Sequence, residues 1–202
     1  MVVNNVEIFF TIALISLIII ASFALIALVL SFKKENRVCC VGSGILLAIT
    51  SIAFGVLAFA LGVIDEGGLS LTEFVEIFTT ISLVVLLIIA LSTSLFTLLA
   101  VKKNVKFCCL GGGIALAGIG IGAGLILSVS FFFNVFFSVM LLSVILSIIT
   151  LVLISIVAFI VVLVSLKKCE GFCCLAGSIA LVGVVIGWSL LGLFTNVVGL
   201  PA

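Results

Sequence analysis

Six long apolar runs, separated by short polar segments, constrain this chain more than any other feature. Each run reaches the roughly 20 residues that a helix needs to cross the hydrocarbon core of a bilayer. The runs are continuous rather than alternating, which argues against the strands of a membrane barrel. We therefore predict an all-α polytopic membrane protein, with six transmembrane helices at residues 9–32, 38–63, 74–101, 108–128, 135–166 and 172–196.

Composition supports the same class and narrows the chemistry. Hydrophobic residues make up 66% of the chain and charged residues 7%, compared with about 25% charged in soluble domains. The chain has no His, so it has no imidazole acid, base or metal ligand, which argues against an enzyme. A net charge of +1 argues against a nucleic-acid partner. We expect no cofactor and a single transmembrane domain over residues 1–202 that has the lipid bilayer as its surroundings.

The basic residues define the expected topology. All eight lie in three short loops, which join the first helix to the second, the third to the fourth and the fifth to the sixth. They are Lys33, Lys34, Arg37, Lys102, Lys103, Lys106, Lys167 and Lys168. The positive-inside rule places these loops in the cytoplasm and both termini on the exoplasmic side. The same lysines are candidate contacts for anionic lipid head groups.

The opposite side carries most of the acidic residues. Asp65, Glu66, Glu73 and Glu76 form the main acidic cluster, which we interpret as a solvated loop or as a weak site for cations such as Ca²⁺. The first apolar run lacks a basic region before it and is too long for a cleavable signal peptide, so we expect it to remain as a helix.

The three basic loops are versions of one another. Each places Lys-Lys at the same interval before Cys-Cys, and the helices that follow align without gaps at offsets of 69 and then 65 residues. We interpret the chain as three tandem helix hairpins, at about 1–63, 70–130 and 135–197. The second helix of each hairpin is rich in Gly, and the first in Leu, Ile, Val and Phe. Because small residues let membrane helices approach closely, we expect the even-numbered helices inside and the odd-numbered ones against lipid.

Small residues form seams along the even-numbered helices, recurring every three or four positions as in left-handed helix packing. The second helix carries Gly44, Ala48, Ser51 and Gly55, followed by Ala58 and Gly62. The fourth helix carries two seams, which are Gly113, Ala117, Gly120 and Gly124, and Gly111, Ala115, Gly118 and Gly122. The sixth carries Ala176, Ala180, Gly183 and Gly187. An offset of two residues is about 200° of helix rotation, so the two seams of the fourth helix lie on nearly opposite faces.

These seams predict that the fourth helix lies between the second and the sixth. We expect the Gly113 seam to face the second helix and the Gly111 seam to face the sixth. A triangular core of the three even-numbered helices, or glycine faces used between subunits, are the alternatives. With this packing, Gly118→Leu or Gly120→Leu is severe, whereas Leu86→Ala on an odd-numbered helix is mild.

Three Cys-Cys pairs stand where the even-numbered helices begin: Cys39, Cys40, Cys108, Cys109, Cys173 and Cys174. A reducing cytosol argues against disulfides there. Cysteines beside lysines at a membrane surface are candidate S-acylation sites in a eukaryote. Three pairs at one depth are also candidate thiolate ligands for a soft metal. The third interpretation is that Cys serves only as a small buried apolar residue.

The interior polarity bears most directly on function. No ionisable residue lies well inside a span, unlike in most ion-coupled transporters. The deep polar groups are Ser and Thr, which can bond to carbonyls of their own helix. We expect a structural or membrane-organising protein that packs against itself, as a homo-oligomer, or against other membrane proteins. The alternative is a channel or facilitator for a small, weakly polar or apolar solute, which needs a water-accessible path along the even-numbered helices.

Overall fold

The protein is all-helical in its computed structural model, which describes residues 2–34, 37–66, 72–132, 137–168 and 171–197. Those residues form six helices: α1 (Val2–Lys34), α2 (Arg37–Glu66), α3 (Thr72–Lys103), α4 (Lys106–Phe132), α5 (Phe137–Lys168) and α6 (Gly171–Val197). Each helix extends past the predicted apolar run into its polar flanks, because backbone hydrogen bonding continues beyond the hydrocarbon region. The predicted start of the fifth helix, residue 135, lies outside the described residues.

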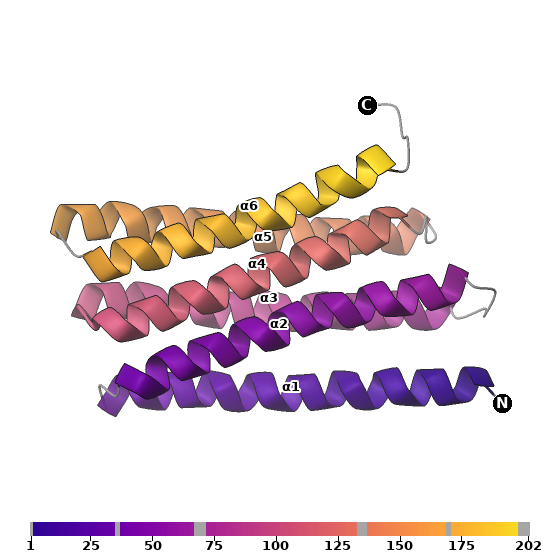
Figure 1. Ribbon diagram of the computed structural model, residues 1–202, viewed down its shortest axis with the longest axis horizontal. Coiled ribbons are helices and arrows are strands. Elements are labelled where there is room, and N and C mark those ends of the chain that lie inside the picture. The colour runs from indigo at the N-terminus through magenta and orange to yellow at the C-terminus, as the bar shows by residue number, and fades with distance from the viewer. Residues whose placement is uncertain (1, 35–36, 67–71, 133–136, 169–170, 198–202) are drawn as a thin grey trace.

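All six helices are long and apolar enough to cross a membrane. The chain is therefore a multi-pass membrane protein by length and composition. In Figure 1 the helices run side by side, with the N-terminal end of α1 at one end of the bundle. The helix ends that carry the basic residues, such as the C-terminal end of α3 at Lys103 and the N-terminal end of α4 at Lys106, lie together at the other end.

The helices form two layers (Figure 1). The near layer contains α2, α4 and α6, with α4 in the middle and in extensive contact with both neighbours. The far layer contains α1, α3 and α5, in which α3 contacts α5 closely and α1 only slightly. Each hairpin joins one helix of each layer, through α1 with α2, α3 with α4 and α5 with α6. A row of three helices, rather than a triangle, therefore describes the even-numbered set.

Burial separates α4 from the other helices. Within its most apolar window, 78% of α4 is buried, whereas α2 and α3 both reach 50%, α5 and α6 both reach 39%, and α1 reaches 22%. The predicted contrast between buried even-numbered and lipid-facing odd-numbered helices is therefore wrong for α3, which is buried as much as α2, and for α6, which is buried no more than α5. A helix at the end of a row is covered on one side only, whatever its glycine content, and α3 is covered by α4 and α5.

Leu86 on α3 illustrates the consequence. Its side chain is fully buried, as are those of its helix neighbours Leu83 and Ala90. The expectation that Leu86 is a lipid-facing position is wrong, because α3 occupies the centre of its layer, and the mild effect expected of Leu86→Ala loses its basis. Truncating a fully buried leucine leaves a cavity that its surroundings fill only in part.

Candidate functional site

The α2–α4 interface brings backbone against backbone. A Cβ atom added at Gly111 would collide with the carbonyl oxygen of Cys40, and one added at Gly118 would collide with the Cα of Ala48. Further along, a Cβ at Gly122 would meet the carbonyl oxygen of Ser51. Glycine is required at these positions because the neighbouring helix occupies the space of any side chain. Small residues are what allow membrane helices to come this close.

The α4–α6 interface is built in the same way on the opposite face of α4. A Cβ at Gly113 would collide with the backbone of Ala176, and one at Gly183 would collide with Ala117. A Cβ at Gly124 would meet the Cα of Gly187. A Cβ at Gly120 would lie 3.2 Å from the nitrogen of Val184, which is slightly less crowded. Both small-residue seams of α4 are therefore used within one chain.

The predicted assignment of the two faces is wrong. The Gly111 seam faces α2 and the Gly113 seam faces α6, the reverse of the expectation. The expectation paired the aligned seams of α2 and α4 with each other. Two parallel helices related by rotation about a twofold axis meet through the same face, but helices related by translation meet through different faces. In this row α4 presents its Gly111 seam to the helix before it, α2, and its Gly113 seam to the helix after it, α6.

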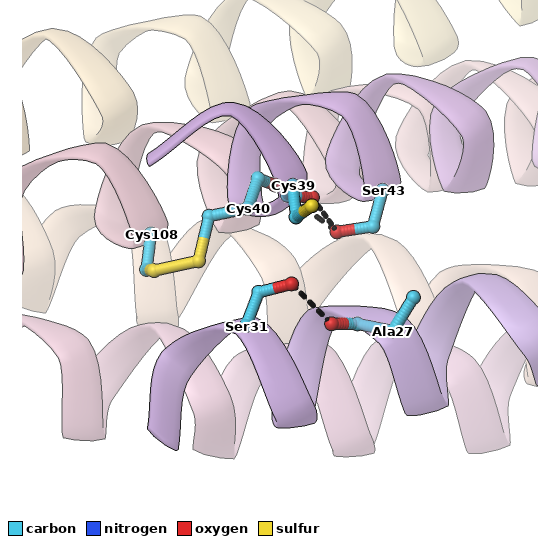
Figure 2. The surroundings of a disulfide bond; sticks show 6 residues. All are labelled: Ala27, Ser31, Cys39, Cys40, Ser43 and Cys108. Atoms are coloured by element: carbon cyan, nitrogen blue, oxygen red, sulfur yellow. Dashed lines mark hydrogen bonds between the residues drawn. A yellow bond between two sulfur atoms is a disulfide. The ribbon is translucent and has the colours of Figure 1, made fainter. Parts of the chain in front are cut away.

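A disulfide between Cys40 and Cys108 joins α2 to α4 at the basic end of the layer, with the two Cα atoms 4.8 Å apart. Figure 2 shows it beside Ser43, whose hydroxyl donates to the carbonyls of Cys39 and Cys40 at 2.6 and 3.2 Å. The expectation of no disulfide is wrong because the close approach at Gly44 and Gly111 brings the two sulfurs together. Both cysteines are fully buried, so a thiol reductant reaches them only if the helices separate.

The other four cysteines among the described residues differ in exposure. Cys39 is exposed and Cys174 half-buried, whereas Cys109 and Cys173 are buried and, like Cys39 and Cys174, lie outside the disulfide. The disulfide removes Cys40 and Cys108 from the candidate acylation sites. Among the described residues, no group of three or more His, Cys, Asp or Glu side chains is arranged to hold a metal ion. The described residues therefore provide no ligand cluster that supports the hypothesis of a soft-metal site.

The loop between α3 and α4 is held by its backbone. Asn104 adopts φ 60°, its amide donates to Val101 O at 3.3 Å, and the Val105 amide donates to Ala100 O at 3.0 Å. These two bonds form a Schellman motif, which ends a helix with one left-handed residue, usually Gly and sometimes Asn. The motif places the exposed Lys102, Lys103 and Lys106 at the basic end of the bundle. The side chains of the other basic residues lie outside the described set.

The acidic cluster is only partly described. Glu73 is exposed and Glu76 half-buried at the start of α3, and the side chains of Asp65 and Glu66 fall outside the described residues. The role of this acidic cluster, as a solvated loop or as a weak cation site, stays a prediction from the sequence.

Hydroxyl groups inside the bundle mostly bond within their own helix. Ser51 donates to Leu47 O at 2.7 Å, Thr93 to Ile89 O at 2.6 Å and Ser128 to Gly124 O at 2.8 Å. Such bonds satisfy the hydroxyl locally and leave it no need of a solute or another helix. Four buried hydroxyls have no hydrogen-bond partner in the described part of the chain: Thr80, Ser82, Ser94 and Ser147. All four lie on α3 and α5 rather than on the glycine-lined layer.

Comparisons with protein-family models, with curated proteins and with solved structures find no match to this chain.

Proposed function

We propose that this protein is a structural or membrane-organising protein, a compact slab of helices that assembles with itself or with other membrane proteins. The observation that carries the proposal is the backbone contact along both faces of α4. A solute path along α2, α4 and α6 needs space where Gly111, Gly118 and Gly124 instead touch neighbouring helices. A close-packed layer without ionisable groups supports a mechanical role better than a transport role.

The outer edges of the layer support a finite slab. On α2 the positions that align with the Gly111 seam of α4 include Leu46 and Ile49, which are 41% and 59% exposed. On α6 the positions that align with the Gly113 seam include Val182 and Val185, which are 58% and 62% exposed. These bulky side chains prevent another helix from adding to the row by the same glycine packing. Assembly between copies then uses broader apolar faces, not an extension of the glycine seams.

Energy transfer between labelled copies tests this proposal. Donor-labelled and acceptor-labelled protein is reconstituted together in phosphatidylcholine vesicles, and the protein is diluted with increasing lipid. A stable assembly keeps its energy transfer on dilution, whereas transfer that falls to the level of randomly mixed monomers argues against self-association. Co-purification with other membrane proteins from the native membrane tests the heteromeric form.

The second candidate is a facilitator of a small, weakly polar solute, and the unpartnered hydroxyls favour it. Ser82 and Ser147 are fully buried on α3 and α5, which contact each other, and Ser94 lies further along α3. A path along these hydroxyls would lie between α3 and α5 rather than along the even-numbered helices. Vesicles containing the protein would then pass glycerol or urea faster than empty vesicles, and Ser82→Ala with Ser147→Ala would remove the difference.

A further inference from the structure

A groove between α1 and α3 contains two cavities in line. The larger, of about 710 Å³, lies at the basic end, lined by Val29 and Phe32 of α1 and by Leu95, Leu99 and Lys103 around the end of α3. The smaller, of about 190 Å³, begins one helical turn deeper, lined by Leu25, Ser22 and Ile18 of α1 and by Ile88 and Val85 of α3. The groove exists because α1 touches α3 only slightly.

The groove has the length of one lipid leaflet. From Ile18 to Phe32 is 14 residues, or about 21 Å of helix, and one leaflet with its head-group region is about 20–22 Å thick. Away from Lys103 its walls are mostly apolar, and the two serine hydroxyls that line it are already bonded within their own helices, Ser22 to Ile18 O at 2.7 Å and Ser92 to Ile88 O at 2.9 Å. The interior of the groove therefore suits an acyl chain and offers nothing to a polar solute.

The mouth of the groove is cationic. Lys103 Nζ lies 5.1 Å from the centre of the Phe32 ring. The Phe32 ring in turn packs edge-on against the Phe96 ring, with 5.3 Å between the two ring centres. The Schellman motif that follows Lys103 fixes the backbone at this residue. Two further exposed lysines, Lys102 and Lys106, are close to Lys103 in the sequence. An ammonium above an aromatic ring still has N–H groups to donate to a phosphate.

We propose that the groove binds one lipid with an anionic phosphate head group, from the leaflet on the basic side of the bundle. The acyl chain occupies the two cavities between α1 and α3, and the phosphate accepts hydrogen bonds from Lys103. The pairing of an apolar groove with a lysine at the head-group level selects this amphipathic anion over a peptide or a soluble phosphate. The site stands independently of the proposed assembly.

Native mass spectrometry of the protein released from nanodiscs tests the site. The nanodiscs contain phosphatidylcholine with phosphatidylglycerol as the minor component. We expect phosphatidylglycerol to be retained preferentially and Lys103→Gln to lower its retention about fivefold, the effect of one lysine at a membrane surface. Lys106→Gln removes the same charge outside the groove and is the matched control. An equal loss in both variants, or equal retention of both lipids by the unaltered protein, overturns the proposal.

A second pair of variants tests the acyl-chain part. Ser22→Phe fills the smaller cavity and should lower phosphatidylglycerol retention, whereas Ser16→Phe, at another exposed serine of α1, should not. Unchanged retention in Ser22→Phe places the lipid elsewhere and overturns the assignment of the groove. Because both positions are at helix surfaces, either variant is expected to fold.

A different observation concerns the cysteines of α4 and α6. The contacts of the α2–α4 interface recur at α4–α6 when residue numbers are advanced by 69 on the first helix and by 65 on the second. Gly44 with Gly111 becomes Gly113 with Ala176, and Ala48 with Gly118 becomes Ala117 with Gly183. The same shift carries the bonded pair Cys40 and Cys108 to Cys109 and Cys173, both of which are buried.

We infer that Cys109 and Cys173 face each other across α4 and α6 and form a second disulfide on oxidation. With diamide as oxidant, the two thiols lose two protons and two electrons to its N=N bond. A sulfur–sulfur bond forms and the diamide becomes a hydrazine, so the step is balanced. The product would close the row of α2, α4 and α6 with one covalent link at each interface.

Cyanogen bromide cleavage tests this pairing, because Met1 and Met140 are the chain's two methionines. Cleavage after Met140 leaves Cys40 and Cys108 on one fragment but separates Cys109 from Cys173. After treatment with diamide the fragments should stay together on a non-reducing gel and separate with reductant. Cys173→Ser should let them separate, and the neighbouring Cys174→Ser should not. Fragments that separate after oxidation, or that depend on Cys174 instead, contradict the pairing.

Discussion

The α2–α4–α6 layer and the α1–α3 pair join apolar helices in opposite ways. In the layer, glycines and alanines bring backbones into contact along both faces of α4. Between α1 and α3 the contacting residues are large, and phenylalanine rings meet near both ends of the helix pair. The ring centres of Phe10 and Phe78 are 5.9 Å apart, and those of Phe32 and Phe96 are 5.3 Å apart. The smaller cavity lies between these ring pairs, and the larger one is lined by Phe32 and Phe96 and extends past them to Lys103. Since lipid solvates apolar side chains as well as protein does, side-chain size rather than apolarity determines which helices pack closely.

The largest effect on the free energy of unfolding is expected from placing a large side chain between α2 and α4. Gly118→Leu places an isobutyl group where the Ala48 backbone lies, so α2 and α4 must separate. We expect a loss of about 3 kcal/mol or more in the free energy of unfolding, or no folded protein. Unfolding in mixed micelles with increasing sodium dodecyl sulfate measures it.

Gly42→Leu is the matched control, because a Cβ at Gly42 has nothing within 4 Å. Its free energy of unfolding should change by about 1 kcal/mol or less, in either direction. If Gly42→Leu is as damaging as Gly118→Leu, general helix propensity rather than close contact explains the glycines.

The next effect concerns the buried centre of the far layer. Leu86→Ala should lower the free energy of unfolding by about 2–3 kcal/mol, since the cavity it leaves forfeits packing contacts even where lipid weakens the transfer component. Leu91→Ala, at a side chain 46% exposed on the same helix, should stay within about 0.5 kcal/mol. The same unfolding assay compares them, and equal values would place Leu86 against lipid.

A smaller effect is expected from the covalent link within the layer. Cys40→Ser opens a loop of 68 residues and should cost about 2 kcal/mol, the low end for disulfides, because the bilayer already restricts the separated helices. Cys39→Ser, one position earlier and exposed, should cost little. When the unaltered protein is unfolded its helices separate, and it is then refolded with a permeant reductant present. The refolded protein should have the stability of Cys40→Ser, and a stability equal to that of the oxidised protein would argue against the link.

The smallest effect has the opposite sign. Ser82 is fully buried with no hydrogen-bond partner, so Ser82→Ala removes a desolvated hydroxyl. We expect stabilisation of up to about 1 kcal/mol. Thr93→Ala is the comparison, because Thr93 donates to Ile89 O and its loss should be neutral or slightly destabilising. A clear destabilisation by Ser82→Ala would indicate that its hydroxyl has a partner such as a bound water.

The sequence predicts much of this fold, since apolar runs define the helices and glycine spacing puts α4 between α2 and α6. It does not predict which face of α4 meets which neighbour, because the Gly111 and Gly113 seams are equally small and only the relation between hairpins in space separates them. The sequence also does not predict the burial of Leu86. Its apolar side chain suits lipid and protein equally, so the pattern carries no signal of burial.

The disulfide shows a second limit of the sequence. A reducing compartment disfavours disulfides in general, whereas the contact at Gly44 and Gly111 that brings Cys40 to Cys108 is visible only in three dimensions. The groove between α1 and α3 was likewise beyond sequence reasoning. Lys103 was a candidate lipid contact among eight basic residues, and no pattern singled it out.

The central claim is that α4 is enclosed without water on both of its glycine faces. Water-edited solid-state NMR of glycine- and lysine-labelled protein in lipid bilayers measures how fast each Cα signal receives magnetisation from water. We expect slow transfer at Gly111, Gly118, Gly120 and Gly124, with fast transfer at labelled Lys102 and Lys106, which are exposed at the ends of α3 and α4, as an internal reference. Transfer to the four α4 glycines as fast as to these lysines would reveal a wet path through the layer and contradict the account.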